Sequence, residues 1–220
     1  MKTVIFDCDG VLVDSEVLSI DAERRVLTDL GLSYDADEYL ARFTGLHDAS
    51  FFSALNADHK ALHGRAAPDD LGARITAARR ANKHLLQAVA GADDALAATA
   101  GRNAVASSSR TEFLEKKLRR TGLWDLAAPH VYSADLVANG KPAPDIFLYA
   151  AEKVQASAAD CIVIEDSVNG VKAGCAAGMT VWGFVGGGHC TPAHAERLQA
   201  AGAERVARTM ADVTDWAKGA

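Results

Sequence analysis

The chain has 220 residues, 49% of them hydrophobic, which suits one large domain or one domain with an insertion. Its formal net charge is −6 and it has no Lys/Arg-rich run, so we expect no binding to nucleic acid or to a membrane. It has no stretch near the ~20 apolar residues that span a bilayer, no room for a cleaved signal before the first strand, and four cysteines without metal-site spacing. We therefore expect a cytoplasmic protein with reduced thiols.

Short strands rich in β-branched residues alternate with alanine-rich helices along most of the chain. The pattern predicts strands over 3–7, 103–107, 130–132, 161–165, 181–184 and, more weakly, 205–206. Helices are predicted between them over 93–99, 111–120, 145–153, 168–177 and 210–216. This alternation indicates an α/β fold with a Rossmann-like parallel sheet and helices on both faces. Ligands of such sheets bind where the strands end.

Residues 15–89 interrupt the alternation, because they contain helical patterns and no convincing strand. Helices are predicted there over 16–30, 36–43, 48–58 and 68–89. An all-helical insertion after the first strand is expected to form a cap over the C-terminal edge of the sheet. We therefore predict a Rossmann-like catalytic core of residues 1–14 and 90–220, and a helical cap domain of residues 15–89.

Two carboxylates follow the first predicted strand. Because side chains alternate along a strand, Asp7 and Asp9 emerge on the same side, and Gly10 permits a tight turn beside them. Two negative charges this close are unfavourable unless a cation lies between them or one takes a proton. Mg²⁺ favours such oxygen ligands and often bridges to a substrate phosphate. The pair therefore indicates a divalent cation site, with a solvated acidic turn as the alternative for the pair taken alone.

Polar residues also end later strands. Ser107 and Ser108 precede a predicted helix whose free N–H groups suit a phosphate, although serine also commonly caps helices. Lys141 lies in a stiff Pro-containing turn, where its charge can neutralise a phosphoryl oxygen. Glu165 and Asp166 end a buried-type strand. This second acidic pair suits a metal ion shared with the first.

The chain resembles the haloacid dehalogenase-like hydrolase superfamily, because four of its motifs occur here in order: Asp7-x-Asp9-Gly10, Ser107, Lys141 and Glu165-Asp166. The longer strings around these residues are similar to the beta-phosphoglucomutase and sugar-phosphatase branch, which includes 6-phosphogluconate phosphatase-like enzymes. The resemblance covers essentially the whole chain, and the insertion is its loosest part.

The resemblance implies a role for each of these residues. Asp7 would attack phosphorus to form an aspartyl-phosphate, and Asp9 would act as general acid and then as general base. Mg²⁺ would be bound by Asp7, the backbone carbonyl of Asp9 and Asp166, with Glu165 as a further ligand or as a partner of one. The phosphoryl group would be held by the hydroxyl and cationic positions, Ser107, Ser108 and Lys141.

Asp9 and the insertion separate the possible reactions. Dehalogenases and phosphonate-cleaving members lack an Asp at this position, so dehalogenation is not expected. Beta-phosphoglucomutases carry a hinge His and a cap Arg that align by eye with Ser19 and Asp48, and neither residue matches. Without that cation to grip a second phosphate, water is favoured as the acceptor. We therefore predict a Mg²⁺-dependent phosphatase of a sugar or sugar-acid phosphate, with a phosphosugar mutase as the alternative.

Other polar residues are open to more than one interpretation. His47 and Asn169 are candidate substrate contacts, although a surface histidine is the alternative for His47. Four cations of the insertion either reach a substrate anion or are solvated helix charges: Arg42, Arg79, Arg80 and Lys83. His189 and His194 follow a glycine-rich run and have no assigned role.

A phospho-receiver switch is the non-enzymatic alternative. Phospho-receiver switches use a similar set of acids, hydroxyl and lysine around Mg²⁺, but they are much shorter and place the phosphorylated Asp on a middle strand. The expected partner is therefore a small phosphorylated substrate rather than a signalling protein. We expect a monomer or a weak homodimer.

Overall fold

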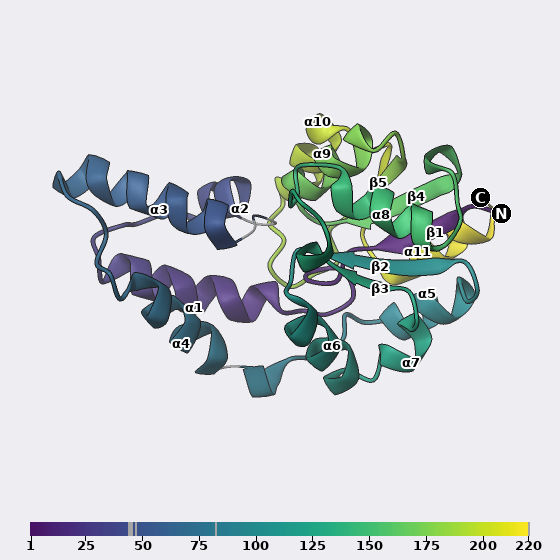
Figure 1. The fold of residues 1–220 in the computed structure, drawn as a ribbon, viewed down its shortest axis with the longest axis horizontal. Coiled ribbons are helices and arrows are strands. Elements are labelled where there is room, and N and C mark those ends of the chain that lie inside the picture. Colours follow the sequence, from purple (N-terminus) through teal and green to yellow (C-terminus); the bar gives the residue numbers. More distant parts are fainter. Residues whose placement is uncertain (44–45, 47, 82, 220) are drawn as a thin grey trace.

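The computed structural model describes residues 1–43, 46, 48–81 and 83–219. In this part of the chain, six strands form one parallel sheet in the order β3-β2-β1-β4-β5-β6 (Figure 1). The strands are β1 (Thr3–Phe6), β2 (Asn103–Ser107), β3 (Val131–Ser133), β4 (Cys161–Glu165), β5 (Thr180–Phe184) and β6 (Arg205–Ala207). This is the strand order of a Rossmann fold, so the predicted α/β architecture is confirmed.

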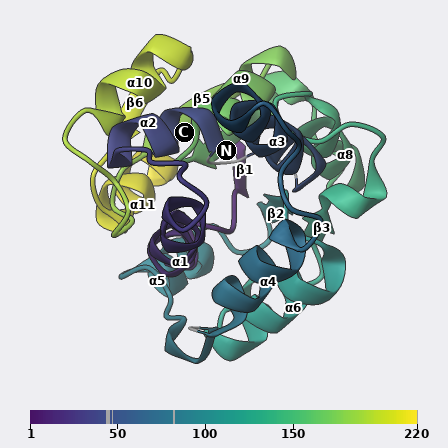
Figure 2. The same cartoon turned by 90° about the vertical axis from the view of Figure 1, so that its left-hand side faces the viewer.

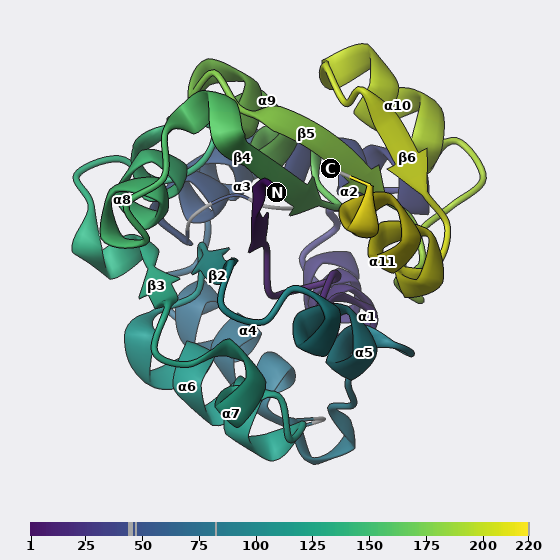
Figure 3. The same ribbon diagram turned by 90° about the vertical axis from the view of Figure 1, so that its right-hand side faces the viewer.

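Helices cover both faces of the sheet (Figure 3). One face packs against α5 (Ala92–Ala98), α6 (Thr111–Arg120), α7 (Trp124–Ala127) and α11 (Met210–Lys218). The other packs against α8 (Asp145–Lys153), α9 (Val168–Ala176) and α10 (His194–Ala201). Two short 3-10 helices, η2 (Ala134–Leu136) and η3 (Ala158–Asp160), connect these elements. The central strands are therefore buried on both sides, which explains their nearly continuous apolar sequence.

The register of the central strands brings the polar residues together. Phe6 of β1 pairs with Val105 of β2 and with Ile164 of β4, so the next residue of each strand lies at one level. Strand order reverses between β1 and β4, and this point is where open parallel sheets bind their ligands. Asp7 and Glu165 therefore emerge side by side at the position expected for a binding site.

Residues 15–89 form a helical unit that projects beyond the sheet, on the side away from both termini (Figures 1 and 2). We refer to these residues as the insertion. Its helices are α1 (Glu16–Thr28), α2 (Ala36–Phe43), α3 (Asp48–His63), α4 (Leu71–Ala81) and the short η1 (Lys83–Leu85). They enclose an apolar cluster of their own, in which the ring of Phe43 lies 5.0 Å from that of Tyr39 and 5.6 Å from that of Phe51. The insertion thus has a separate core.

The predicted elements agree with the observed ones except in a few segments. The predicted helix over 68–89 is shorter, because α4 begins at Leu71 after Pro68 and ends at Ala81. Helix α3 continues beyond the predicted end at residue 58 to His63. Helices α7 and α10 were not predicted. Both are short and follow loops, so their apolar periodicity is weak as a sequence signal.

Among the described residues, no helix combines the length and the apolar character needed to cross a bilayer. The four cysteines all lie in the described part and are free thiols.

Candidate active site

A buried lysine joins two of the predicted acidic residues. Lys141 Nζ donates to Asp7 Oδ1 at 2.6 Å, to Glu165 Oε1 at 2.7 Å and to the carbonyl oxygen of Ala106 at 3.2 Å. Burial lowers the pKa of Lys141, but Asp7 and Glu165 more than offset this effect and raise it above its ordinary value. Lys141 is therefore a fixed positive charge at the C-terminal edge of the sheet.

Three carboxylates lie close together at this edge of the sheet. One oxygen from each of Asp7, Glu165 and Asp166 lies within 4.8 Å of the others. Burial raises the pKa of Asp7 well above its ordinary value, against the opposing effect of Lys141, and burial likewise raises the pKa of Glu165. Excess buried negative charge and an all-oxygen donor set fit a hard divalent cation such as Mg²⁺.

The two carboxylates that follow β4 differ in how they are held. Glu165 uses both oxygens, because Oε1 accepts from Lys141 and Oε2 accepts from the backbone N–H and the hydroxyl of Ser167, each at 2.9 Å. Asp166 Oδ2 is buried and, among the described side chains, meets only Nε2 of His189, at 3.0 Å. Its oxygen faces Gly10, where a Cβ atom would lie only 1.8 Å away. Asp166 is therefore the more available of the two as a metal ligand.

Asp9 lies beside a second cation, which the sequence did not indicate. Lys117 of α6 and the Ser15 hydroxyl both donate to Asp9 Oδ1, and Ser109 Oγ donates to Oδ2 at 2.7 Å. Burial raises the pKa of Asp9, but Lys117 and the hydroxyl donors outweigh burial and lower it. Asp9 is therefore a carboxylate in this arrangement. Lys117 is separated from Asp9 by 108 residues, and its sequence context, Glu-Lys-Lys, is that of any exposed helix face.

The serine residues at the end of β2 lie in the same site. Ser107 Oγ accepts from the backbone N–H of Ser109 at 3.0 Å, and Ser133 Oγ donates to the carbonyl oxygen of Ser109 at 2.7 Å. The Ser108 hydroxyl is buried and has no hydrogen-bond partner among the described residues. Together with the first turn of α6, these residues supply donors for an anion.

A cavity of about 860 Å³ joins these residues to the insertion. Ser19 and Asp48, the positions that departed from the mutase pattern, both line it. Arg79 lines it as well and is held by Glu23 and by Asp48, whose Oδ1 lies 2.9 Å from Arg79 Nη1. The cavity is therefore shaped by the core on one side and by the insertion on the other.

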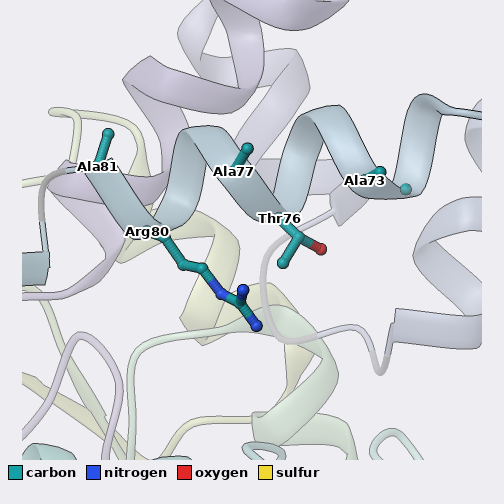
Figure 4. A pocket seen from close by; sticks show the side chains of 6 residues that line it. Ala73, Thr76, Ala77, Arg80 and Ala81 are labelled. Atoms are coloured by element: carbon teal, nitrogen blue, oxygen red, sulfur yellow. The ribbon is translucent and has the colours of Figure 1, made fainter.

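A second hollow of about 590 Å³ runs along α4 and shares two lining residues with this cavity, Thr76 and Arg80. Both side chains project from the same side of the helix (Figure 4). No ion pair of Arg80 occurs among the described residues.

The remaining candidate contacts are placed as follows. Arg42 forms an ion pair with Asp58 at 2.7 Å within the insertion. Asn169 lies in the first turn of α9 and is partly buried. His47 and the side chain of Lys83 lie outside the described part of the structure.

Two histidines without an assigned role meet Asp166. His189 Nε2 lies 3.0 Å from Asp166 Oδ2, and His194 Nε2 contacts the backbone carbonyl oxygen of Asp166. Burial lowers the pKa of His189, but Asp166 more than offsets it, so that the pKa rises to about 11. Burial lowers the pKa of His194. These contacts could not be expected from the sequence, since both histidines follow a glycine-rich loop of unpredictable path.

Comparison with known proteins places this site in a family. The sequence matches the haloacid dehalogenase-like hydrolase family over residues 1–178. It is 27% identical to the 6-phosphogluconate phosphatase of Escherichia coli (strain K12), over 87% of this chain and 86% of that protein. It is 30% identical to the beta-phosphoglucomutase of Bacillus subtilis (strain 168), over 97% of this chain and 92% of that protein.

Solved structures agree with the sequence comparisons. A haloacid dehalogenase-like protein of unknown function from Agrobacterium tumefaciens str. C58 superposes with a TM-score of 0.86 and is 35% identical. The match covers 98% of this chain and 97% of that one. Both the sheet and the insertion therefore have counterparts in a solved structure.

Proposed function

Because the chain belongs to the haloacid dehalogenase-like hydrolase family, we propose that it is a Mg²⁺-dependent phosphatase of a sugar or sugar-acid phosphate. The observation that carries the proposal is the buried group of Asp7, Lys141, Glu165 and Asp166. It combines a nucleophile, a cation and an oxygen-rich metal site at one edge of the sheet. Relatives that are phosphatases of phosphorylated carbohydrates support the same chemistry.

Asp7 is the proposed nucleophile. Its carboxylate attacks phosphorus, the bond to the leaving oxygen breaks, and an aspartyl-phosphate forms that water then hydrolyses. Lys141 holds Asp7 Oδ1 and opposes the rise in pKa that burial causes. Bound Mg²⁺ would be held by Asp7, Asp166 and the backbone carbonyl of Asp9, and would offset the charge of the phosphoryl oxygens.

Asp9 is the proposed general acid and base. In the first step the acid form of Asp9 gives its proton to the leaving oxygen. In the second step the carboxylate form, which Lys117 favours, takes a proton from the hydrolytic water. Ser15 and Ser109 each donate to one of its oxygens, so the carboxylate is held in one orientation. Ser107, Ser108 and Lys141 are proposed to position the phosphoryl group.

The substrate is proposed to be enclosed between the core, residues 1–14 and 90–220, and the insertion acting as a cap. A cavity of about 860 Å³ accommodates a six-carbon sugar phosphate. Arg80 and Lys116 line it and form no ion pair with any described residue. These unpaired cations, Arg80 from the insertion and Lys116 from the core, favour a substrate with a second negative group, such as a sugar-acid phosphate. A cytoplasmic enzyme that is a monomer or a weak homodimer stays our prediction.

The proposal is tested by release of inorganic phosphate from a panel that includes 6-phosphogluconate and sorbitol 6-phosphate. 6-Phosphogluconate has a carboxylate where sorbitol 6-phosphate has a hydroxymethyl group. The difference in their rates therefore measures the contribution of the second negative charge of the substrate. Asp7→Asn is expected to abolish phosphate release while circular dichroism and the melting temperature stay close to those of the wild type. Asp215→Asn, an exposed change near the C-terminus, serves as the control. Wild-type turnover by Asp7→Asn would show that Asp7 is not the nucleophile.

A phosphosugar mutase is the second candidate, favoured by similarity to a beta-phosphoglucomutase over nearly the whole chain. Against it, the cavity presents Asp48 where the mutase pattern has an arginine, and Arg79 is engaged by Glu23 and Asp48. Incubation with beta-glucose 1-phosphate and a bisphosphate primer separates the two. Glucose 6-phosphate appearing faster than inorganic phosphate would favour the mutase.

A further inference from the structure

The two histidines that follow β5 hold Asp166 from two directions. His189 approaches its side chain, with Nε2 3.0 Å from Oδ2, and His194 contacts its backbone carbonyl. All three residues are buried. A carboxylate that binds a metal ion needs partners that fix its orientation, and such partners commonly determine metal affinity. His189 and His194 have the position of such partners.

The hydrogen bonds of His194 define its tautomer. Nε2 faces a carbonyl oxygen, which can only accept, so this nitrogen carries the proton. Nδ1 lies 3.3 Å from Nη2 of Arg197, which can only donate, so Nδ1 accepts. His194 and Arg197 are three residues apart on α10, a spacing that places both side chains on one face. Arg197 therefore holds the ring that contacts Asp166.

Arg197 also reaches the insertion. Its Nη1 lies 2.7 Å from Oδ1 of Asp37, in the first turn of α2. Nη2 donates to Thr191 Oγ1 at 3.2 Å, and the Thr191 hydroxyl donates to the same oxygen of Asp37. In the part of the chain that the structure describes, this is the one ion pair between the insertion and the core. The guanidinium thus contacts the insertion with one arm and His194 with the other.

We propose that Asp37, Arg197 and His194 couple the position of the insertion to the geometry of Asp166. When the insertion closes, Asp37 holds Arg197, Arg197 holds the His194 ring, and His194 holds the Asp166 backbone. When it opens, Arg197 loses its anionic partner and His194 loses the group that orients it. The metal site is then best ordered when the insertion is closed, as in a lid that completes a catalytic arrangement. The inference rests on the proposed role of Asp166 as a Mg²⁺ ligand.

A separate metal site in the same segment explains the contacts less well. His189, Cys190 and His194 present potential ligand atoms within 4.8 Å of one another. However, Nε2 of each histidine faces an oxygen of Asp166, and Nδ1 of His194 faces Arg197. If the two histidines position Asp166, each of these nitrogens keeps the partner that it has in the structure.

The test compares Asp37→Asn and Arg197→Met with the wild type. The Mg²⁺ dissociation constant is measured by titration calorimetry without substrate, and both variants are expected to bind Mg²⁺ about 3- to 10-fold more weakly. This effect is smaller than the 10- to 100-fold of a direct partner of a ligand. In the metal-free protein, hydrogen exchange of the segment around Asp166 is expected to be faster in both variants. Glu38→Gln, an adjacent acidic residue of α2 that pairs within the insertion, is the matched control.

Two further variants distinguish coupling from a simple contact. Arg197→Lys can retain the ion pair with Asp37, but its single ammonium group cannot reproduce the two-armed contact, so Mg²⁺ binding is expected to remain weak. Combining Asp37→Asn with Arg197→Met is expected to weaken Mg²⁺ binding no further than either change alone, because both residues act in one chain of contacts.

Failure of the coupling and failure of the proposed function would give different results. If the variants bind Mg²⁺ and exchange hydrogen like the wild type, and only the KM for substrate rises, Asp37 and Arg197 merely attach the insertion and the coupling is wrong. If the wild type itself binds no Mg²⁺ and releases no phosphate from any substrate of the panel, the proposed function fails, and the coupling fails with it.

Discussion

Gly10 follows the first acidic pair and lies against Asp166 of the second. Its φ is +81°, a conformation that favours glycine, and an added Cβ would lie 1.8 Å from Asp166 Oδ2. An added Cβ therefore requires the Asp166 carboxylate or the backbone of Gly10 to shift. The glycine thus allows Asp166 to lie against the backbone that carries Asp7 and Asp9.

Gly10→Ala is expected to lower phosphate release by about 100-fold, because a displacement near 1 Å of an active-site group has an effect of that size. Backbone strain is expected to lower the free energy of unfolding by about 1–2 kcal/mol. Gly101→Ala is the matched control, since Gly101 has a φ of +76° with no atom within 4 Å of an added Cβ. Steady-state kinetics and thermal denaturation should show strain in both variants and loss of activity in Gly10→Ala alone. Equal activities would refute the steric explanation.

At the scale of the element, the start of α9 links helix stability to the site. Ser167 is the N-cap of α9, and its hydroxyl accepts from the backbone N–H of Gly170 at 2.9 Å. The same hydroxyl donates to Glu165 Oε2 at 2.9 Å. One side chain therefore ends the loop after β4, starts the helix and orients the carboxylate that Lys141 holds.

Ser167→Ala is expected to lower the free energy of unfolding by about 1–2 kcal/mol, as the loss of an N-cap does. It is also expected to reduce kcat, because Glu165 loses a donor next to Lys141. Thr209→Ala removes the capping box of α11, and because Thr209 is not among the residues that line the cavity, it is the control for stability alone. Chemical denaturation and phosphate release distinguish the two variants. If Ser167→Ala keeps full kcat, the link between the cap and Glu165 has no catalytic consequence.

At the scale of the whole molecule, the junction of core and insertion carries a buried acid that responds to pH. Burial raises the pKa of Glu16, the first residue of α1, to about 7, and the carboxylates of Asp9 and Asp166 act in the same direction. His189 opposes them. The folded protein therefore keeps a proton that the unfolded chain releases above its ordinary pKa near 4.5. The contribution to stability is present below pH 4.5 and is lost as the pH rises through about 7.

Glu16→Gln is expected to remove this dependence. In the metal-free protein, the variant and the wild type should have the same free energy of unfolding near pH 4. At pH 8 the free energy of unfolding of the variant should be higher by on the order of 1–2 kcal/mol, a value reduced because the Glu16 side chain is partly exposed. Urea denaturation in EDTA across this pH range measures the difference. A constant offset between the two proteins from pH 4 to pH 8 would show that Glu16 does not titrate in this window.

The division between core and insertion was visible in the sequence because each part has its own periodicity. Buried parallel strands need apolar runs, and amphipathic helices need a period near 3.6 residues. The split of the predicted helix over 68–89 and the helix α10 were not visible. Their ends depend on packing against other segments, which periodicity does not report.

The sequence by itself determined the proposed chemistry. Asp7, Asp9, Ser107, Lys141, Glu165 and Asp166 follow elements whose order and register place them at one edge of the sheet, so local patterns were enough to bring them together. Which residues hold them was decided only by the tertiary structure. Lys117 lies 108 residues from Asp9, and Arg197 lies 160 residues from Asp37. Contacts at such separations depend on the path of loops and the rotation of helices, which carry no periodic signal. The sequence therefore indicated the residues of the candidate site, and the fold decided what holds them and what encloses them.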